Sequence, residues 1–494
     1  MDGEQPPRGG LRLQDPGLLR DCAYVDGRWT AAENGGLFPV GDPATGAELA
    51  QVADLGVSET RAAIEAAARA FPAWRAKTAK ERAAILRRWY ELIIANQDDL
   101  AVLMTSEQGK SLAESRGEVA YGAAFVEWFA EEGKRLYGDI VPPTAPGRRI
   151  VVLKEPIGVT AAITPWNFPI AMITRKVAPA IAAGCTSVIK PAKLTPLSAL
   201  ALAELAERAG LPAGVLNVVT SSKASDIGKE LCTNPLVRKV SVTGSTEIGK
   251  LVMRMSADTV KKVSLELGGN APFIVFDDAD LDAAVQGAMA SKYRNSGQTC
   301  VCANRLLVQD GVYDAFAAKL AEAVRELKVG PGLEPGVQQG PLIDENAVRK
   351  CEDHIADAVA KGARIVVGGG RHPLGGTFFE PTLLVDVNTQ MKVAREETFG
   401  PVAPLFRFET EAQAIAMAND TEFGLASYFY ARDVGRVWRV AEALEYGMVG
   451  VNEGIISTEV APFGGVKESG IGREGSRYGI EEYCEIKYVC MGGI

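Results

Sequence analysis

Two cysteines one residue apart, Cys300 and Cys302, stand in the segment NSGQTCVCANR over residues 295–305. A cysteine thiolate can attack a carbonyl carbon, and it forms readily only where a cation or a helix terminus lowers the thiol pKa from about 8.5. Cysteine is also common as a small buried residue. The spacing alone therefore leaves open whether one thiol is a nucleophile or both pack in the core.

A cysteine nucleophile needs a base close to it. A cysteine–histidine hydrolase would need an imidazole, and the chain has only two histidines, His354 and His372. Glu266, in LELGGNAP, is flanked by leucines, and apolar surroundings raise a carboxyl pKa toward the range of a general base. The alternative is a strand-edge carboxylate held by the two glycine amides. A cysteine–glutamate mechanism fits the composition better than a cysteine–histidine one.

Asn167 lies between prolines and aromatic residues in TPWNFP, residues 164–169. A side-chain amide held in a rigid turn can donate a hydrogen bond to a developing oxyanion. Most asparagines in such turns only stabilise the turn, so this segment is a weak indication by itself.

Two further segments could hold a nucleotide. In SVTGSTEIG, Gly244 and Ser245 lie between a predicted strand and a predicted helix, and the free N–H groups of a helix start suit a pyrophosphate. The segment lacks the G-x-G-x-x-G fingerprint, so an ordinary helix cap is the alternative. In VIKPAKLTP, Lys190 and Lys193 follow a buried strand, at the sheet edge where α/β proteins bind ligands. Two solvated loop lysines would give the same pattern.

The composition excludes several classes of protein. The net charge of −9 is spread over 494 residues without long runs of like charge, which argues against a nucleic-acid partner. No apolar run approaches the roughly 20 residues of a membrane span. The eight cysteines show neither CxxC pairs nor zinc spacing, so we predict reduced thiols and no metal. Residues 1–21 lack signal-peptide features and are predicted to be a flexible arm on a cytoplasmic enzyme.

The pattern of apolar residues predicts the elements that position these groups. Residues 58–109 are helical, and Thr78 with Glu81 forms a capping box. Strands and helices then alternate, with a second alternating block over 270–452, which predicts parallel sheets built from βαβ units. The C-terminal segment over 477–490 alternates like an edge strand.

Seven segments in one order resemble the aldehyde dehydrogenase superfamily from about residue 22 to the C-terminus: PWNFP, VIKPA, VTGSTEIG, LELGGNAP, GQTCVCANR, EETFGPV and PFGGVKESGIGREG. The resemblance implies an α/β fold with a Rossmann-like cofactor domain, an α/β catalytic domain and a small β flap that joins subunits into a homodimer or homotetramer. The implied ranges are 22–138 and 159–268 for the cofactor domain, 269–452 for the catalytic domain, and 139–158 with 475–494 for the flap.

Carried over position by position, the resemblance makes Cys300 the nucleophile that attacks an aldehyde. Asn167 and the Cys300 amide would hold the oxyanion of the thiohemiacetal, and Glu266 would activate the water that hydrolyses the resulting thioester. Neither a metal nor a histidine is required. The residues implied to bind the nicotinamide cofactor are Trp166, Lys190, Lys193, Gly244, Ser245, Glu397 and Phe399.

The segments around the nucleophile are most similar to the succinate-semialdehyde dehydrogenases of the superfamily, which assigns Arg175, Arg294 and Ser457 to the substrate's distal carboxylate. A charged hydrogen bond contributes about 1.5–3 kcal/mol. Two would separate a carboxylated aldehyde from an alkyl one by roughly two to four orders of magnitude. Alternatively, Arg175 is a surface residue and Arg294 a structural ion pair. Glutarate semialdehyde is one methylene longer, which a pocket distinguishes by only about 1–3 kcal/mol, and another short aliphatic aldehyde stays open.

Lys193 stands where many NAD-preferring members carry Glu, so we expect NADP to be preferred, with NAD possible. Cys302 matches no catalytic position of the superfamily. We hypothesise that it forms a reversible disulfide with Cys300 on oxidation, although the spacing is awkward for disulfide geometry and simple loop packing is the alternative. A non-catalytic structural protein, or a thioesterase without cofactor, would leave several of the seven segments without a purpose.

Overall fold

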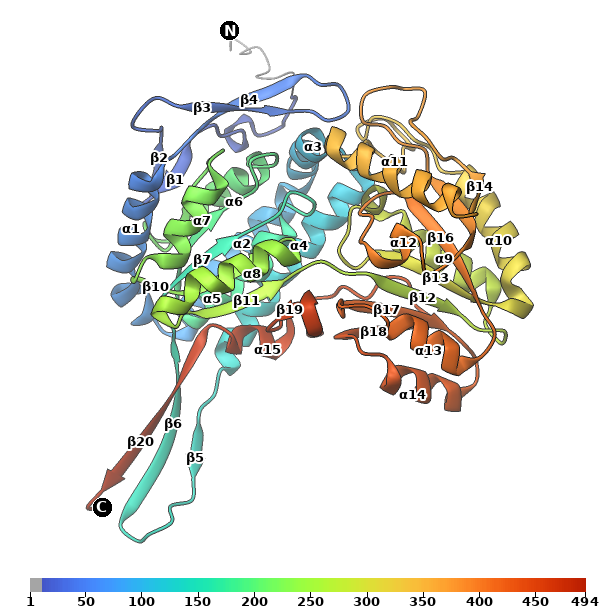
Figure 1. The fold of residues 1–494 in the computed structure, drawn as a ribbon. Coiled ribbons are helices and arrows are strands. Elements are labelled where there is room, and N and C mark those ends of the chain that lie inside the picture. Colours follow the sequence, from blue (N-terminus) through green and yellow to red (C-terminus); the bar gives the residue numbers. More distant parts are fainter. Residues whose placement is uncertain (1–10) are drawn as a thin grey trace.

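Two open α/β sheets, each packed against helices through two hydrophobic clusters, form the two halves of the computed structural model, which describes residues 11–494 (Figure 1). A three-stranded sheet projects from the first half. A two-stranded sheet, β3 (Leu37–Gly41) and β4 (Glu48–Ala53), completes the strands of the described residues.

The first sheet has eight strands in the order β19-β11-β10-β7-β8-β9-β1-β2. Its five central strands, β7 to β11, pair in parallel, whereas β1, β2 and β19 pair antiparallel at the two sides. The parallel pairing predicted from the alternating sequence pattern is confirmed. The strands are β1 (Ala23–Val25), β2 (Arg28–Thr30), β7 (Val159–Ile163), β8 (Thr186–Lys190), β9 (Leu216–Val218), β10 (Val237–Thr243), β11 (Lys262–Glu266) and β19 (Gly470–Ile471).

The second sheet has seven strands in the order β14-β15-β16-β13-β12-β17-β18, and only β14 pairs antiparallel. The second alternating block of the sequence therefore also forms a parallel sheet. The strands are β12 (Ala271–Val275), β13 (Ala303–Gln309), β14 (Arg364–Val367), β15 (Thr382–Val387), β16 (Val402–Phe408), β17 (Ala426–Tyr430) and β18 (Met448–Val451).

The helices follow the predicted pattern. The capping box is confirmed, since Thr78 Oγ1 accepts a hydrogen bond from the Glu81 N–H at 3.3 Å and the Glu81 carboxylate accepts one from the Thr78 N–H at 2.7 Å. The helices of the first half are α1 (Val57–Arg75), α2 (Ala79–Ala95), α3 (Gln97–Gln108), α4 (Leu112–Glu132), α5 (Ala171–Ala183), α6 (Leu197–Arg208), α7 (Ala224–Thr233) and α8 (Thr246–Ser256). Those of the second are α9 (Leu281–Lys292), α10 (Asp310–Arg325), α11 (Glu345–Ala360), α12 (Lys392–Arg395), α13 (Glu411–Asn419) and α14 (Val434–Ala443), and α15 (Ser476–Glu481) follows β19.

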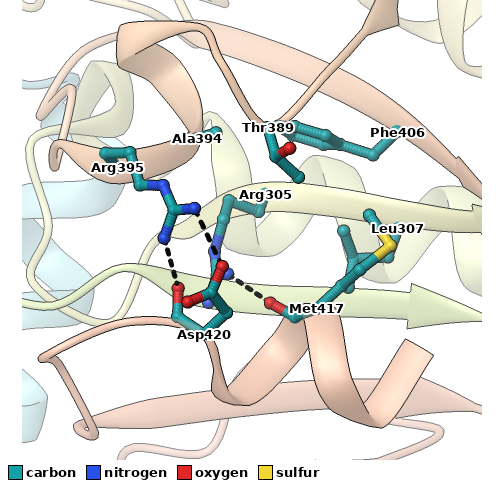
Figure 2. Close-up of a pocket in the computed structure, with 8 residues that line it drawn as sticks. All are labelled: Arg305, Leu307, Thr389, Ala394, Arg395, Phe406, Met417 and Asp420. Carbon is teal, nitrogen blue, oxygen red and sulfur yellow. Dashed lines mark hydrogen bonds and ion pairs between the residues drawn. The ribbon is translucent and has the colours of Figure 1, made fainter. Parts of the chain in front are cut away.

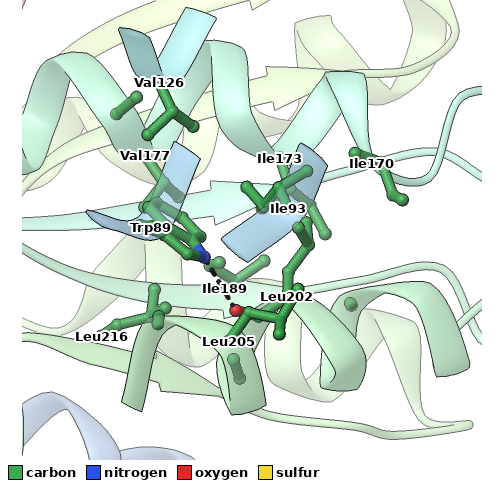
Figure 3. Packing of buried hydrophobic residues seen from close by; sticks show 14 of the residues in the cluster. Trp89, Ile93, Val126, Ile170, Ile173, Val177, Ile189, Leu202, Leu205 and Leu216 are labelled. Atoms are coloured by element: carbon green, nitrogen blue, oxygen red, sulfur yellow. Dashed lines mark hydrogen bonds between the residues drawn. The ribbon is translucent and has the colours of Figure 1, made fainter. Parts of the chain in front are cut away.

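Apolar side chains of α2, α4, α5 and α6 pack on one face of the first sheet and form its largest core cluster (Figure 3). Trp89 is fully buried there, and its indole Nε1 donates a hydrogen bond to the Leu202 carbonyl at 3.1 Å. Side chains of α1, α7 and α8 cover the other face. The sheet is therefore rigid on both sides, and its strand ends hold fixed positions.

The projecting sheet consists of β5 (Asp139–Val141), β6 (Arg148–Pro156) and β20 (Cys484–Gly492), in the order β20-β6-β5. β20 pairs antiparallel with β6 along its whole length, which confirms the predicted strand from Cys484 onward, whereas residues 477–481 of that prediction form helix α15 instead. Figure 1 shows these strands extending away from the two halves. Large apolar side chains on them face solvent, with 83% of Ile140, 74% of Ile486 and 62% of Tyr488 exposed.

Residues 11–21 differ from the flexible arm expected there. Leu18 is fully buried, and the Asp99 carboxylate accepts hydrogen bonds from the backbone N–H groups of Gln14 and Asp15 at 2.8 and 2.7 Å. Apolar burial and backbone hydrogen bonds therefore fix this segment on the first half. The remainder of the expected arm, residues 1–10, lies outside the described residues. No helix within residues 11–494 is long and apolar enough to cross a membrane.

Candidate active site

A cavity of about 350 Å³ lies where the two halves meet, at the carboxyl ends of parallel strands. Segments that follow β7, β10 and β11 line it from the first half, and α11 together with segments preceding β13 and β16 lines it from the second. The lining residues are Pro165, Trp166, Asn167, Thr243, Gly244, Ser245, Leu267, Gly268, Cys300, Asn346, Ala347, Lys350, Glu397, Thr398 and Phe399.

Several residues predicted from the sequence thus meet at one cavity. They come from four separate segments and are Trp166, Asn167, Gly244, Ser245, Cys300, Glu397 and Phe399. Other predicted residues do not line it, namely Arg175, Lys190, Lys193, Glu266, Arg294, Cys302 and Ser457. The first-half segments follow β7 and β10, whereas those that carry Cys300, Glu397 and Phe399 precede β13 and β16, so the cavity joins the carboxyl edge of one parallel sheet to the amino edge of the other.

The loop before Cys300 has an unusual backbone. Asn295 and Ser296 have φ of 50° and 57°, in the left-handed region that such residues rarely adopt. Gly297 continues with φ 73°, and a Cβ there would lie 2.2 Å from the Gly400 carbonyl oxygen. Only glycine fits at this position, so the contact fixes the nucleophile loop against the segment that precedes β16.

Asn167 is held from both ends. Its carbonyl accepts hydrogen bonds from Lys110 Nζ at 2.6 Å and Asn295 Nδ2 at 3.0 Å, and its own Nδ2 donates one to the Gln298 carbonyl at 3.0 Å. The buried ammonium of Lys110 is paired with Glu118 at 2.5 Å. One hydrogen of the Asn167 amide remains available to an acceptor in the cavity.

The Cys300 thiol is strongly desolvated. Burial raises its pKa to about 12, and the positive charge of Arg175 opposes this rise without outweighing it. The thiol is therefore protonated at neutral pH, and attack on a carbonyl requires that a base remove its proton.

Glu266 ends β11, directly before the cavity-lining Leu267 and Gly268. Burial raises the pKa of its carboxyl well above the ordinary value, and the nearby Glu474 carboxylate adds to this effect. Its Oε2 atom is buried without a hydrogen-bond partner among residues 11–494. A carboxyl in this state suits proton transfer near neutral pH.

A buried group of charges lies beside Glu266. The Glu474 carboxylate accepts a hydrogen bond from Arg175 Nε at 2.6 Å and pairs with Lys176 Nζ. Burial alone would raise the pKa of Glu474, but Arg175 and Lys176 outweigh it and hold that pKa at about 2. Two neighbouring glutamates thus have opposite shifts, which is the usual sign of distinct acid–base roles.

Arg175 is only 2% exposed, and its guanidinium stacks 4.0 Å from the Phe463 ring centroid. It is thus a buried residue rather than a surface one, and it is occupied by Glu474. The sequence did not reveal this pairing, because Arg175 and Glu474 are 299 positions apart.

Arg294 and Ser457 line one small pocket of about 10 Å³, which holds at most one water. The Arg294 guanidinium stacks over Phe168 at 4.8 Å, and no carboxylate within residues 11–494 forms an ion pair with it. The structural ion pair considered for Arg294 is therefore absent from the described residues. A guanidinium that pairs with no acidic group of the described residues can receive a carboxylate.

The opposite side of the cavity has the donor set of a nucleotide site. Ser245 caps α8, its Oγ accepting the Ile248 N–H at 3.4 Å. Burial raises the pKa of Glu397 to about 7, while a hydrogen bond from the Gly269 N–H at 3.0 Å opposes the rise. Phe399, with φ 56°, meets Trp166 edge to face at 5.7 Å.

Lys190 and Lys193 follow β8, as expected, but differ in their surroundings. Burial lowers the pKa of Lys190 to about 8, and the charge of nearby Lys193 adds to this effect. The Lys190 ammonium donates a hydrogen bond to the Pro191 carbonyl at 3.1 Å. Lys193 is exposed and pairs with no carboxylate of the described residues.

A second pocket, of about 10 Å³, lies away from these residues and is lined by Arg305 and Arg395 (Figure 2). The Arg305 guanidinium donates hydrogen bonds to the carbonyls of Asn270, Met417 and Ala418. Although Arg305 belongs to the GQTCVCANR segment, its donors are used in joining strands to α13.

Three residues near the cavity were missed by sequence reasoning: Lys176, Lys350 and Glu474. Lys176 directly follows Arg175, and Glu474 lies inside the segment PFGGVKESGIGREG, so both stood beside recognised positions. Lys350 lies on α11, one turn after the lining residue Asn346. Helical spacing would have placed the two on one face, but the sequence does not say that this face lines the cavity.

Comparisons with known proteins agree with this arrangement. The chain matches the model of the aldehyde dehydrogenase family over residues 29–489. It is 68% identical to a glutarate-semialdehyde dehydrogenase of Pseudomonas aeruginosa and 67% identical to a succinate-semialdehyde dehydrogenase (NADP(+)) of Escherichia coli, over 98% of this chain and 100% of each relative. A crystal structure of an Escherichia coli NADP-dependent enzyme, 67% identical, superposes with a TM-score of 0.97 over 97% of this chain and 100% of that one. The predicted fold class is confirmed.

Proposed function

The chain belongs to the aldehyde dehydrogenase family, and we propose that it oxidises succinate semialdehyde to succinate with NADP⁺, using Cys300 as the nucleophile. The observation that carries the proposal is the single cavity shared by Cys300, Asn167 and Glu397. A nucleophile, an amide donor and a ribose-binding carboxylate face the same space, as a reaction between a covalently held aldehyde and a nucleotide requires.

In the first step Cys300 Sγ attacks the aldehyde carbon. Because burial keeps the thiol protonated, Glu266 takes up its proton, directly or through a water. The oxyanion of the thiohemiacetal accepts hydrogen bonds from the free amide hydrogen of Asn167 and from the Cys300 backbone N–H. Lys110 and Asn295 hold Asn167 for this purpose through its carbonyl.

The residues fit a nicotinamide dinucleotide. The start of α8 at Ser245 offers N–H groups to a pyrophosphate, and the Glu397 carboxylate can accept hydrogen bonds from ribose hydroxyls. Lys190 and Lys193 would lie at the adenine ribose, with Gly244, Trp166 and Phe399 shaping the cavity walls. A bound nicotinamide would supply the acceptor for the hydride of the thiohemiacetal carbon, and Cys300 would then carry the thioester.

Glu266 then removes a proton from the water that hydrolyses the thioester. The group formed by Glu474, Arg175 and Lys176 keeps a fixed charge beside Glu266 and so sets its pKa. These three residues act through Glu266 and are positioning residues. Release of the acid returns Cys300 to the thiol.

The proposal of a carboxylated substrate is supported by Arg294 and Ser457, which line one pocket. No carboxylate of the described residues pairs with the Arg294 guanidinium, so it can bind the carboxylate of a substrate. Arg175, which the resemblance also assigns to this carboxylate, is already paired with Glu474 and is left out of the proposed substrate site. Glutarate semialdehyde is a second candidate, because the glutarate-semialdehyde dehydrogenase relative is as similar as the succinate-semialdehyde one. Both substrates present a short aldehyde with a terminal carboxylate.

We further propose that the projecting sheet joins chains into a homodimer or homotetramer, with domains as bounded from the sequence. The solvent-facing Ile140, Ile486 and Tyr488 support an interface there. All eight cysteines are unpaired, which supports a reducing, cytoplasmic location.

The test compares kcat/KM for succinate semialdehyde, glutarate semialdehyde and butanal, each with NADP⁺ and with NAD⁺, in wild type, Arg294→Gln and a control, Arg395→Gln. Arg395 lies on the surface, paired with Asp420, outside the cavity. We expect the preference for carboxylated aldehydes to fall about tenfold or more in Arg294→Gln only. Equal rates on butanal and succinate semialdehyde in the wild type would refute the carboxylate specificity.

A further inference from the structure

Two buried groups that the proposed mechanism does not use, Lys292 and Cys302, contact each other. Lys292 Nζ donates a hydrogen bond to Cys302 Sγ at 3.4 Å, and the thiol in turn donates to the Lys292 carbonyl at 3.4 Å. Lys292 is fully buried and Cys302 is 6% exposed. Lys292 is the last residue of α9, and Cys302 directly precedes β13, so packed elements hold both.

The amine of Lys292 has an unusual environment. Within residues 11–494, Cys302 Sγ is the only hydrogen-bond partner of Lys292 Nζ. Buried ammonium groups normally pair with carboxylates, as Lys110 does with Glu118. A thiol is a weak acceptor, so the contact brings together an amine and a sulfur that no stronger partner occupies.

We propose that Lys292 and Cys302 form an oxidative modification site, in which oxidation of Cys302 by a peroxide ends in a covalent sulfur–nitrogen link to Lys292. The Cys302 thiol first reacts with hydrogen peroxide to give a sulfenic acid and one water. The Lys292 nitrogen then attacks that sulfur through its lone pair; the S–N bond forms, the S–O bond breaks, and the hydroxyl leaves with a proton from the nitrogen as a second water. One peroxide is reduced, and the sulfur is oxidised by two electrons.

The geometry favours Lys292 over Cys300 as the group that captures oxidised Cys302. The hydrogen bonds of the Cys302 sulfur go to Lys292 and to the Ala303 carbonyl, and none goes to Cys300. Cys300 lines the cavity, whereas Cys302 does not. The amine is already in contact with the Cys302 sulfur, and the Cys300–Cys302 disulfide is the alternative that the experiment tests.

The link has two consequences. It stops the oxidation of Cys302 at a stage that thiols can reverse, before sulfinic acid forms. It also ties the end of α9 to the start of β13, which closes the base of the loop that carries Cys300. The proposal is independent of the proposed substrate and cofactor, because the reaction involves neither.

The experiment treats the full chain with hydrogen peroxide, blocks free thiols, digests with chymotrypsin and maps the peptides by mass spectrometry. Chymotrypsin cleaves after Tyr293, so the peptides with Lys292 and Cys302 stay together only if they are linked. The expected product weighs two hydrogens less than the two peptides and separates on treatment with dithiothreitol. A link with one additional oxygen also supports the proposal. That oxygen comes from a second peroxide, whose other oxygen leaves as water.

The same digestion is run on Cys300→Ser, which removes the competing thiol, and on Lys292→Arg, which keeps a cation but lacks the amine. We expect the link in Cys300→Ser and irreversible sulfinic acid at Cys302 in Lys292→Arg. Cys22, a half-buried thiol whose charged neighbours are Asp21 and Arg20, is the internal control and stays unlinked. A Cys300–Cys302 disulfide, or a sulfinic acid at Cys302 with Lys292 unmodified in the wild type, would overturn the proposal. The wild-type map decides alone if Lys292→Arg does not fold.

Discussion

The interior beneath Cys300 and the projecting sheet differ in which side chains they bury and which they expose. Beneath Cys300, charged groups are buried and held by one another, as Glu474 is by Arg175 and Lys176. On the projecting sheet, apolar groups such as Ile140 and Ile486 are exposed and touch little of their own chain. The interior thus holds buried charges that are paired with one another, and the sheet has apolar groups that are largely exposed.

This difference indicates where each region's function is exercised. A buried charge costs several kcal/mol unless it is paired, so the interior group is kept for what it does to Glu266. An exposed apolar surface is favourable only if another surface covers it, which supports the proposal that the sheet joins chains. Substitutions in the interior should change stability and chemistry, and those on the sheet should change assembly.

The largest effect is expected for Glu474→Gln, which leaves Arg175 and Lys176 without a buried carboxylate. The free energy of unfolding, measured by urea denaturation, should fall by about 3–5 kcal/mol. The pKa of Glu266 should also fall, because a negative neighbour is lost, so the acidic limb of the pH–rate profile should move to lower pH. In Glu481→Gln, the exposed partner of Lys154, the loss should be below about 1 kcal/mol. If the free energy of unfolding falls equally in Glu474→Gln and Glu481→Gln, the buried pairs are no more important for stability than an exposed pair, and the comparison fails.

Glu266→Gln should separate activity from stability. The kcat should fall by roughly 10²–10⁴ because the general base is lost. The pKa of Glu266 is raised in the folded state, so its ionisation destabilises the fold as pH rises through that pKa. Unfolding curves should therefore show that the variant is more stable than the wild type at pH 8. Near pH 3 the two proteins should not differ, because Glu266 is protonated in both the folded and the unfolded wild type. A variant that is less stable at pH 8 would show that the carboxylate is a structural partner.

Lys193→Glu tests a residue of intermediate character, exposed yet close to a proposed binding site. The ratio of kcat/KM for NADP⁺ to that for NAD⁺ should fall by about 10–100-fold, because a carboxylate would repel a 2′-phosphate. The ratio for Lys193→Gln should lie between the ratios for the wild type and Lys193→Glu. If the ratio is the same in all three proteins, Lys193 is a solvated loop lysine.

The smallest effect on a single chain is expected for Ile486→Asp. Sedimentation should show dissociation into smaller species, while the free energy of unfolding of the separated chain changes by less than about 0.5 kcal/mol. Leu374→Asp, which is also exposed but lies on a loop of the second half, should leave the assembly unchanged. Assembly that survives Ile486→Asp would place the subunit contact elsewhere.

Much of the cavity could be predicted because its residues lie at the ends of predicted parallel strands. Gly244 and Ser245 follow β10, and Glu266 ends β11. Once the alternation of strands and helices indicates a parallel sheet, those ends must lie at one edge. The parts that escaped prediction depend on contacts between distant segments. Residues 11–21 pack on Asp99, and Glu474 reaches Arg175 across 299 positions.

The sequence by itself determined the family, the two parallel sheets and the residues that meet at the cavity, because local patterns and ordered motifs encode strand ends and turns. Only the tertiary structure decided the electrostatic state of those residues. Burial raises the pKa of Cys300 and Glu266, while paired cations lower that of Glu474. Desolvation and charge pairing depend on which side chains surround a group in space, and neighbours along the chain do not specify them. For the same reason the sequence shows only that Cys302 is close to Cys300 along the chain, whereas the fold shows that the Cys302 sulfur contacts Lys292 Nζ.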